Sequence, residues 1–286
     1  MSDPKTILVT GGTGNQGGAV ARCLSQKGFT VKVLTRNPES PKALALKNMN
    51  IELIKGDLND PQTYLGVLQD VYGVFSVQTF MNGVDKEIKQ GTSLAESAME
   101  AGVKHFVYSS ASGAEMNSGV PQFESKMLIE KQIQKLGLPY TIIRPASFYE
   151  NFLIPQVRNA ILKGNLLQSI SKETVLQYIS VDDIGKAVSV IFENPAGYMG
   201  KELTIAAEQM SVEEVTRVFS ETLGRSITYK SVPDIITRIF MGKNLYRMFK
   251  WVDAHSAPSV KIVESTKKQF PDIVSLKDWI IKNFKP

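Results

Sequence analysis

The feature that most constrains the fold is a glycine-rich segment near the N-terminus, KTILVTGGTGNQGGAVARCL, from Lys5 to Leu24. It places five glycines between an apolar run and an amphipathic one. Each glycine costs conformational entropy and packs no side chain, so a purely structural turn needs only one or two. The density of glycine predicts that another group comes very close to this backbone.

Three of these glycines have the spacing of a dinucleotide-binding turn, Gly12-x-Gly14-x-x-Gly17. The first permits a tight turn, the second admits a pyrophosphate, and the third lets the helix approach the strand. The first amides of the helix and its dipole then favour phosphate groups. A structural turn is the alternative, but the strand before the motif and the helix after it favour a nucleotide site.

Strand-like and helix-like segments alternate through the first half of the chain, which predicts a parallel sheet with helices on both faces. We therefore expect an α/β fold built on a Rossmann-type, doubly wound parallel sheet. The expected strands are residues 6–10, 30–35, 51–56, 73–79, 104–110 and 140–145.

The second half has a looser rhythm and predicts a smaller mixed α/β C-terminal domain. We expect an NAD(P)-binding Rossmann domain over 1–151 and a smaller substrate or partner domain over 152–286. The boundary is soft, because the strand-like segment 201–206 can rejoin the main sheet. Helices are predicted at 180–194, from the capping box of Ser211 and Glu214 onwards, and at 275–284.

Composition narrows the protein class. The 286 residues are 43% hydrophobic, and no apolar run approaches the roughly 18 residues of a membrane span. Residues 6–10 form too short an apolar run for a signal peptide, so we expect a cytoplasmic protein without a membrane span. The net charge of +5 suits a polyphosphate ligand but is too weak and dispersed to predict direct nucleic-acid binding.

The single cysteine, Cys23, excludes an internal disulfide, and its position predicts a small residue in the core. His105 and His255 are far apart in sequence, so no metal site is predicted.

The end of the second predicted strand bears on which dinucleotide is bound. An acidic residue there would accept a hydrogen bond from the ribose 2′-hydroxyl of NAD, but LTRNP supplies Arg36 and no acid. A guanidinium can pair with a 2′-phosphate, and Lys42 is a candidate second cation. The sequence favours NADP(H) over NAD(H); a solvated loop arginine is the alternative.

A lysine lies on the apolar face of a predicted helix, residues 121–136. Ile129, Ile133 and Leu136 form its inward stripe, which continues backwards to Lys126 and Gln122. A lysine aligned with a buried stripe is costly unless it meets an anion or a polar ligand. The alternative is that its ammonium extends along the surface to water.

Taken together, ILVTGGTGNQGGAVA, VLTRNP, GDLND, FESKMLIE and IIRPASFYENF resemble the NmrA-like family of atypical short-chain dehydrogenases/reductases. The resemblance covers almost the whole chain and is strongest through Asn151. It implies that the glycine loop binds NADP(H). The residues that it implies for the cofactor are Gly11, Gly12, Thr13, Gly14, Asn15, Gln16, Gly17, Arg36, Asp57, Leu58, Val77, Gln78, Lys126, Pro145 and Phe148.

The resemblance also implies individual roles. Arg36 matches the residue for the 2′-phosphate, and Lys126 matches the lysine that reaches the nicotinamide ribose. The pair Asp57 and Leu58 matches the residues flanking adenine, although Asp57 could instead cap a turn. The remaining matches are Val77 and Gln78 near the ribose, and Pro145, Phe148 and Asn151 at the nicotinamide end. Phe148 and Asn151 are the candidate substrate residues, with a core position the alternative for Phe148.

The usual proton donor of the wider superfamily is missing. Its members use Tyr-x-x-x-Lys, in which the lysine lowers the pKa of the phenol. This chain has Gln122 in place of the tyrosine, and an amide is no acid or base near neutral pH. Lys126 and Tyr149 are the candidate catalytic residues, and Ser110 is a further possibility.

Two functions fit this pattern. One is an NADPH-dependent oxidoreductase for a quinone-like or other conjugated small molecule, whose reduced oxyanion is stabilised without a strong acid. The other is a non-catalytic redox sensor that binds NADP(H) and a regulatory protein partner. The apolar and basic segment 234–252 allows a third reading, a membrane-surface or partner-binding helix; helices covering a substrate pocket are the alternative.

Overall fold

The computed structural model describes residues 4–240, 242–256 and 258–284. The chain forms two compact units. The first contains the residues up to Met116, together with 123–145 and 181–204, and the second contains 117–122, 146–180 and 205 onwards. The chain passes between the units several times, whereas the sequence predicts a single boundary after Asn151.

The first unit is built on a seven-stranded sheet of order β10-β6-β5-β4-β1-β2-β3, in which β1 to β6 are paired in parallel. This confirms the predicted doubly wound fold. The strand order reverses between β1 and β4, where such sheets bind ligands at the carboxyl ends of their strands. The late strand does rejoin the sheet, beside β6. The bounds are β1 Thr6–Val9, β2 Thr30–Thr35, β3 Glu52–Lys55, β4 Gly73–Ser76, β5 His105–Ser109, β6 Tyr140–Pro145 and β10 Lys201–Ile205.

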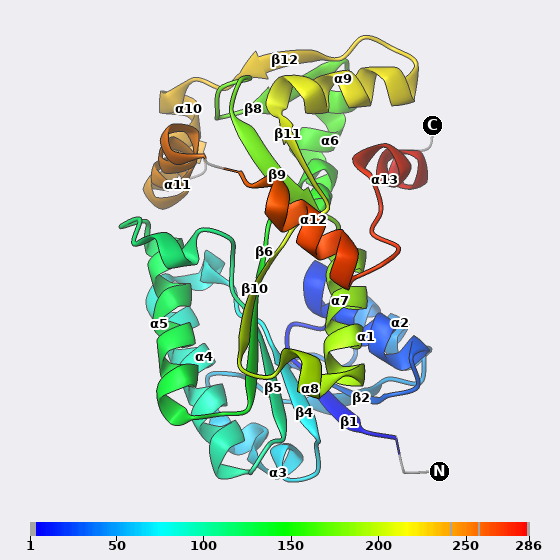
Figure 1. The fold of residues 1–286 in the computed structure, drawn as a ribbon, viewed down its shortest axis with the longest axis vertical. Coiled ribbons are helices and arrows are strands. Elements are labelled where there is room, and N and C mark those ends of the chain that lie inside the picture. The colour runs from blue at the N-terminus through cyan, green and yellow to red at the C-terminus, as the bar shows by residue number, and fades with distance from the viewer. Residues whose placement is uncertain (1–3, 241, 257, 285–286) are drawn as a thin grey trace. The chain divides into compact units, whose positions relative to one another are not determined.

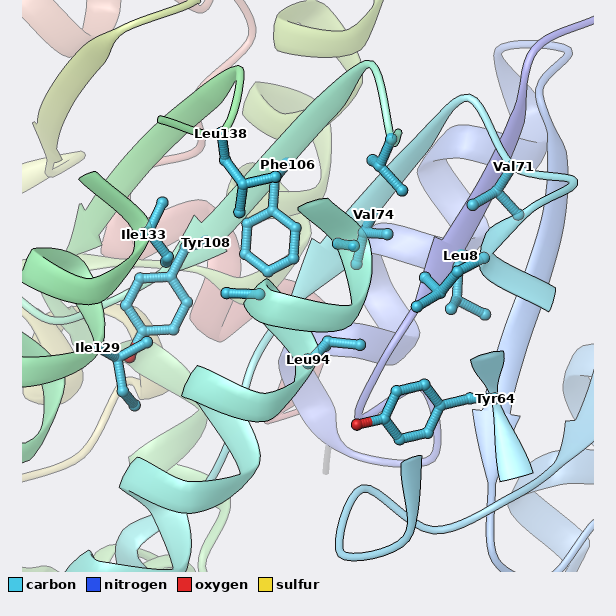
Figure 2. Close-up of a cluster of buried hydrophobic side chains, with 14 of the residues drawn as sticks. Leu8, Tyr64, Val71, Val74, Leu94, Phe106, Tyr108, Ile129, Ile133 and Leu138 are labelled. Carbon is cyan, nitrogen blue, oxygen red and sulfur yellow. The ribbon is translucent and has the colours of Figure 1, made fainter. Parts of the chain in front are cut away.

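Helices cover both faces of this sheet (Figure 1). Residues from α3, α4 and α5 pack on one face in a buried cluster that includes Leu94, Phe106, Ile129 and Ile133 (Figure 2). The predicted helix from Pro121 to Leu136 is observed as α5. The bounds are α1 Asn15–Gln26, α2 Pro41–Lys47, α3 Leu65–Leu68, α4 Val84–Glu100, α5 Pro121–Leu136, α7 Val181–Glu193 and α8 Pro195–Tyr198.

On the other face, α7 packs closely against α1. The predicted stripe of α7, which includes Ile184 and Val188, is fully buried. A Cβ at Gly185 would lie 2.8 Å from both the carbonyl oxygen of Ala19 and Sγ of Cys23, so only glycine permits this approach. Cys23 is half-buried in this contact, and burial raises the pKa of its thiol.

The second unit is a mixed α/β unit with a three-stranded sheet, β11-β9-β7, and a two-stranded one, β12-β8. Its core is aromatic: Phe152 packs edge-on against Phe219 and lies next to Trp279. The predicted capping box of Ser211 and Glu214 is present at the start of α9. The bounds are β7 Ser147–Phe148, β8 Asn165–Gln168, β9 Val175–Ile179, β11 Glu208–Ser211, β12 Thr228–Ser231, α6 Pro155–Leu162, α9 Val212–Leu223, α12 Val260–Gln269 and α13 Leu276–Asn283.

The apolar and basic segment 234–252 forms two helices, α10 (Asp234–Phe240) and α11 (Gly242–His255). Met241, between them, lies outside the described residues, and Gly242 has a φ of +83°. Three isoleucines of α10 are exposed, while Lys250 of α11 forms an ion pair of 2.8 Å with Asp234. Its membrane or partner role stays a prediction. None of the described helices has the length and apolarity needed to cross a bilayer.

A buried histidine of the first unit predicts acid sensitivity. The side chain of His105 is fully buried, its Nε2 is 2.8 Å from Oγ1 of Thr141, and burial lowers its pKa to about 4. The unfolded chain therefore takes up a proton below about pH 6.5 that the folded chain takes up only near pH 4. We expect the free energy of unfolding to fall by about 3 kcal/mol from this group as the pH drops through that window.

Urea unfolding between pH 7.5 and 4.5 measures this effect. His105→Gln, which cannot titrate, should lose less stability over that window than the unaltered protein. His255→Gln, at an exposed histidine, is the matched control and should keep the original pH dependence. Parallel curves for His105→Gln and the unaltered protein would contradict the assignment.

Candidate functional site

The glycine segment forms the turn between β1 and α1, at the point where the strand order reverses. Gly11 has a φ of +62°, which favours glycine. A Cβ at Gly17 would lie 2.4 Å from the carbonyl oxygen of Gly11, and one at Gly12 would lie 2.4 Å from Cγ1 of Val33. The backbone at these positions is therefore packed too closely for any side chain.

The first turn of α1 faces this crowded backbone without a side-chain cap. Gly14 is the N-cap in an extended conformation, and its amide donates to the carbonyl of Gly11 at 2.9 Å. Thr13 is half-buried and Asn15 is exposed, whereas Nε2 of Gln16 donates inward to Oγ of Ser109 at 2.5 Å. The helix begins with unpaired amides and a partial positive charge, which suits an anionic ligand.

The neighbouring strand ends carry buried polar atoms. Oγ1 of Thr10 accepts from the amide of Val77 at 2.8 Å, which ties the end of β1 to the residue after β4. Nε2 of Gln78 donates to Oγ of Ser76 at 3.0 Å. Oε1 of Gln78 and Oγ of Ser110 are buried without a hydrogen-bond partner among the described residues. Because such atoms are costly to leave unpaired, they indicate a polar ligand or water at this edge.

The predicted adenosine-end residues follow β2 and β3. Arg36 is exposed directly after β2, and it forms no ion pair within the described part of the chain. Lys42 is exposed on α2. Asp57 accepts from the amide and the side-chain nitrogen of Asn59 at 2.9 and 2.6 Å, so the turn-capping alternative for Asp57 is present in the structure. Leu58 is half-buried beside it.

The buried lysine of α5 has an anionic partner that sequence reasoning missed. Nζ of Lys126 lies 3.0 Å from Oε1 of Glu87 on α4, and both residues are buried. Oγ of Ser125 donates to the other oxygen of Glu87 at 2.6 Å. Glu87 lies on the same helical face as the buried Gly91 and Leu94. A charged residue on a buried stripe is the signal that identified Lys126, and it would also have identified Glu87.

The remaining predicted residues lie at or after the end of β6. Pro145 is the last residue of β6 and is buried. In the second unit, Phe148 is half-buried and Asn151 is exposed. Tyr149 is fully buried, and its hydroxyl donates to Glu208 at 2.8 Å. Its phenolic proton therefore already has an acceptor, and its catalytic role stays a prediction.

The residues of the first unit fit a dinucleotide. The turn that only glycine can form, the uncapped start of α1 and the unpartnered acceptor of Gln78 each match a need of a phosphate-bearing, polar ligand. Within the described residues, no group of three histidine, cysteine or carboxylate side chains is placed to hold a metal ion.

Comparison with known proteins identifies the family of this chain. The model of the NmrA-like family matches residues 3–279. An NAD(P)H azoreductase of Xenophilus azovorans is 30% identical over 229 residues, which cover 79% of this chain and 77% of the relative.

Solved structures share the fold. NADPH-dependent quinone oxidoreductase of Escherichia coli, solved with NADPH, has a TM-score of 0.80 at 22% identity and covers 98% of this chain and 100% of its own. NmrA, a negative transcriptional regulator solved with NADP, has a TM-score of 0.81 at 21% identity and covers 99% of this chain and 96% of its own. NmrA has also been solved with NAD.

The close packing of the glycine turn is testable by adding one methyl group. We expect Gly17→Ala to lower the free energy of unfolding by about 1–3 kcal/mol, because its Cβ would collide with the Gly11 carbonyl. The control is Gly66→Ala in α3, where the residue is exposed and nothing lies within 4 Å of the added Cβ. Urea unfolding of both variants checks the prediction; equal stability of Gly17→Ala and the unaltered protein would refute the geometry.

Proposed function

We propose that this chain, which belongs to the NmrA-like family, is an NADP(H)-dependent reductase that passes hydride to a quinone-like or other conjugated small acceptor. The observation that carries the proposal is the backbone at Gly12 and Gly17, which has no room for a side chain and leads into an uncapped helix. When bound, the coenzyme supplies the hydride, and the residues of the chain bind and orient it.

The proposed binding residues act on different parts of the coenzyme. The amides that begin α1, with Thr13 and Asn15 beside them, would hold the pyrophosphate. Asp57 and Leu58 would flank the adenine, and Lys126 would bind the nicotinamide ribose. Further proposed contacts come from Gly11, Gly12, Gly14, Gln16, Gly17, Val77, Gln78, Pro145 and Phe148.

The proposed preference for NADP(H) rests on Arg36. Its exposed guanidinium follows β2, without an acidic residue that would select a 2′-hydroxyl. Arg36 could form a charge-assisted pair with a 2′-phosphate, because no carboxylate of the described residues pairs with it.

We also propose that the protein acts in the cytoplasm, as the sequence predicts.

The proposed acceptor class follows from the missing acid. Gln122 cannot donate a proton in catalysis, and the hydroxyl of Tyr149 is bonded to Glu208. An acceptor that delocalises the negative charge formed by hydride addition can take its proton from water. The names of the azoreductase and the quinone oxidoreductase support such an acceptor. Phe148 and Asn151 of the second unit are its proposed contacts.

The second candidate function is a redox sensor that binds NADP(H) and a regulatory protein without turnover. NmrA, named as a negative transcriptional regulator, has been solved with both NADP and NAD. The absence of an acid at position 122 restricts a reductase to acceptors that need no enzymic proton donor. It equally favours a sensor, which needs no proton donor at all. Binding of the coenzyme is common to both functions, so turnover must separate them.

Arg36→Ala tests the coenzyme preference. We expect NADPH to bind roughly tenfold to a hundredfold more weakly, because a charge-assisted contact to the 2′-phosphate is lost, while the Kd for NADH changes less than about twofold. Titration calorimetry measures both. Lys47→Ala, at an exposed lysine of α2, is the control and should change neither value. Equal affinity of the unaltered protein for the two nucleotides would end the proposed preference.

Single-turnover kinetics test the reductase itself. Stopped-flow mixing of the NADPH-bound protein with a panel of quinones and azo dyes should show oxidation of NADPH well above the rate of the free coenzyme. Lys126→Met is expected to slow this oxidation or weaken NADPH binding, since it removes the ammonium that would orient the ribose. Tight binding of NADPH with no oxidation beyond the free rate would instead support the sensor.

A further inference from the structure

A fully buried carboxylate connects α4 to α5. No part of Glu87 is exposed, and it lies in the first turn of α4. Its Oε1 accepts from Nζ of Lys126 at 3.0 Å, and its Oε2 accepts from Oγ of Ser125 at 2.6 Å. Two consecutive residues of α5 therefore satisfy both oxygens of one carboxylate.

The two helices approach too closely for this contact to be a chance surface pair. One turn along α4, a Cβ at Gly91 would lie 2.6 Å from Cδ1 of Ile129 on α5. Ile129 is itself fully buried in the cluster of the first unit (Figure 2). The close Gly91–Ile129 contact holds the helices at a distance that Glu87 spans.

Other groups near the pair do not replace Glu87. Glu130, one turn beyond Lys126, hydrogen-bonds to Arg144, with Nε of Arg144 at 3.0 Å from Oε1. Burial, with the charges of Glu87 and Glu130, raises the pKa of the Tyr108 phenol on β5 well above its ordinary value. Glu87 is therefore the carboxylate that pairs with Lys126.

The pair needs an explanation beyond stability. Removing two charges from water costs about as much as their attraction returns, and apolar residues of similar volume would hold two helices as well. A lysine in the first turns of a helix can also extend its flexible stem to water. Lys126 does not; Glu87 holds its ammonium inside the protein.

The number of donors indicates what the pair is suited for. An ammonium group has three N–H donors. One of them donates to Glu87, which is the acceptor of Lys126 among the described residues. Two donors remain, and two adjacent hydroxyls of a ribose would accept both.

We infer that Glu87 is a positioning residue: it fixes the ammonium of Lys126 so that two of its N–H groups bind the ribose diol of a nicotinamide nucleotide. The inference deepens the proposed function and rests on it for the identity of the ligand. Glu87 acts only through Lys126 and touches neither coenzyme nor acceptor.

A double-mutant cycle on NADPH affinity tests the inference in the full-length protein. The variants are Glu87→Gln, Lys126→Met and their combination, with Kd from quenching of protein fluorescence. We expect Glu87→Gln to weaken NADPH binding about threefold to tenfold and Lys126→Met at least as much. In the Lys126→Met background, Glu87→Gln should have no further effect. Glu96→Gln, which changes an exposed glutamate of α4 bonded to Gln132, is the matched control.

Kinetics separate positioning from a folding defect. If the unaltered protein turns over, Glu87→Gln should raise the KM for NADPH with kcat changed less than about twofold, whereas a loss of folded protein would lower kcat alone. Should Glu87→Gln not fold, Glu87→Asp takes its place, because it keeps the buried charge but shortens the reach to Lys126. We expect Glu87→Asp to weaken NADPH binding, and an unchanged Kd in folded Glu87→Asp would overturn the inference.

Two outcomes overturn the inference: an unchanged Kd in folded Glu87→Gln, or a further loss of affinity in the double variant beyond that of Lys126→Met. Failure of the proposed function looks different. If the unaltered protein binds NADPH but shows no turnover, the reductase proposal fails and the double-mutant cycle can still be measured. If the unaltered protein does not bind NADPH, both proposals fail.

Discussion

The organisation of the first unit depends on how closely the start of α1 approaches the end of β1. A Cβ at Gly17 would lie 2.4 Å from the carbonyl oxygen of Gly11 and 2.5 Å from that of Thr10. A helix that begins against a strand end in this way directs its first amides to the carboxyl ends of β1 and β4, where the strand order reverses. The same contact fixes the connection between strand and helix and shapes the proposed phosphate-binding surface, so a change at Gly17 should affect both.

Two buried ion pairs in the core of the first unit each include a residue of α5. Lys126 pairs with Glu87 of α4, and one turn later Glu130 pairs with Arg144 of β6. Each pair joins α5 to a different neighbour, α4 or β6. Both pairs can form at once in only one placement of α5, so they fix the helix on two sides. Apolar packing through Ile129 supplies the attraction between α4 and α5. The charges add little to that attraction, but they specify which side chains meet.

Local patterns in the sequence predicted much of this structure. Glycine spacing gave the turn after β1, alternation of apolar runs gave the parallel sheet, and the stripe through Ile133 gave α5 with its observed ends. The partner of Lys126 was not identified, because Glu87 precedes it by 39 residues and meets it only when two helices pack. The bond from Tyr149 to Glu208 spans 59 residues and could not be inferred for the same reason. Local periodicity predicts which residues face the core, but not which of them meet there.

The balance of charge at Lys126 bears on which acceptors the protein could reduce. The carboxylate of Glu87, 3.0 Å from the ammonium of Lys126, offsets most of its positive potential. Lys126 is therefore better suited to orient a ligand than to stabilise a developing oxyanion. With an amide at position 122 and the hydroxyl of Tyr149 already bonded, the described residues at these positions provide no strong acid. An acceptor must then carry its own stabilisation, as a quinone or another conjugated system does. If no acceptor meets that requirement, the proposed coenzyme contacts are unaffected, and the redox sensor is the remaining candidate function.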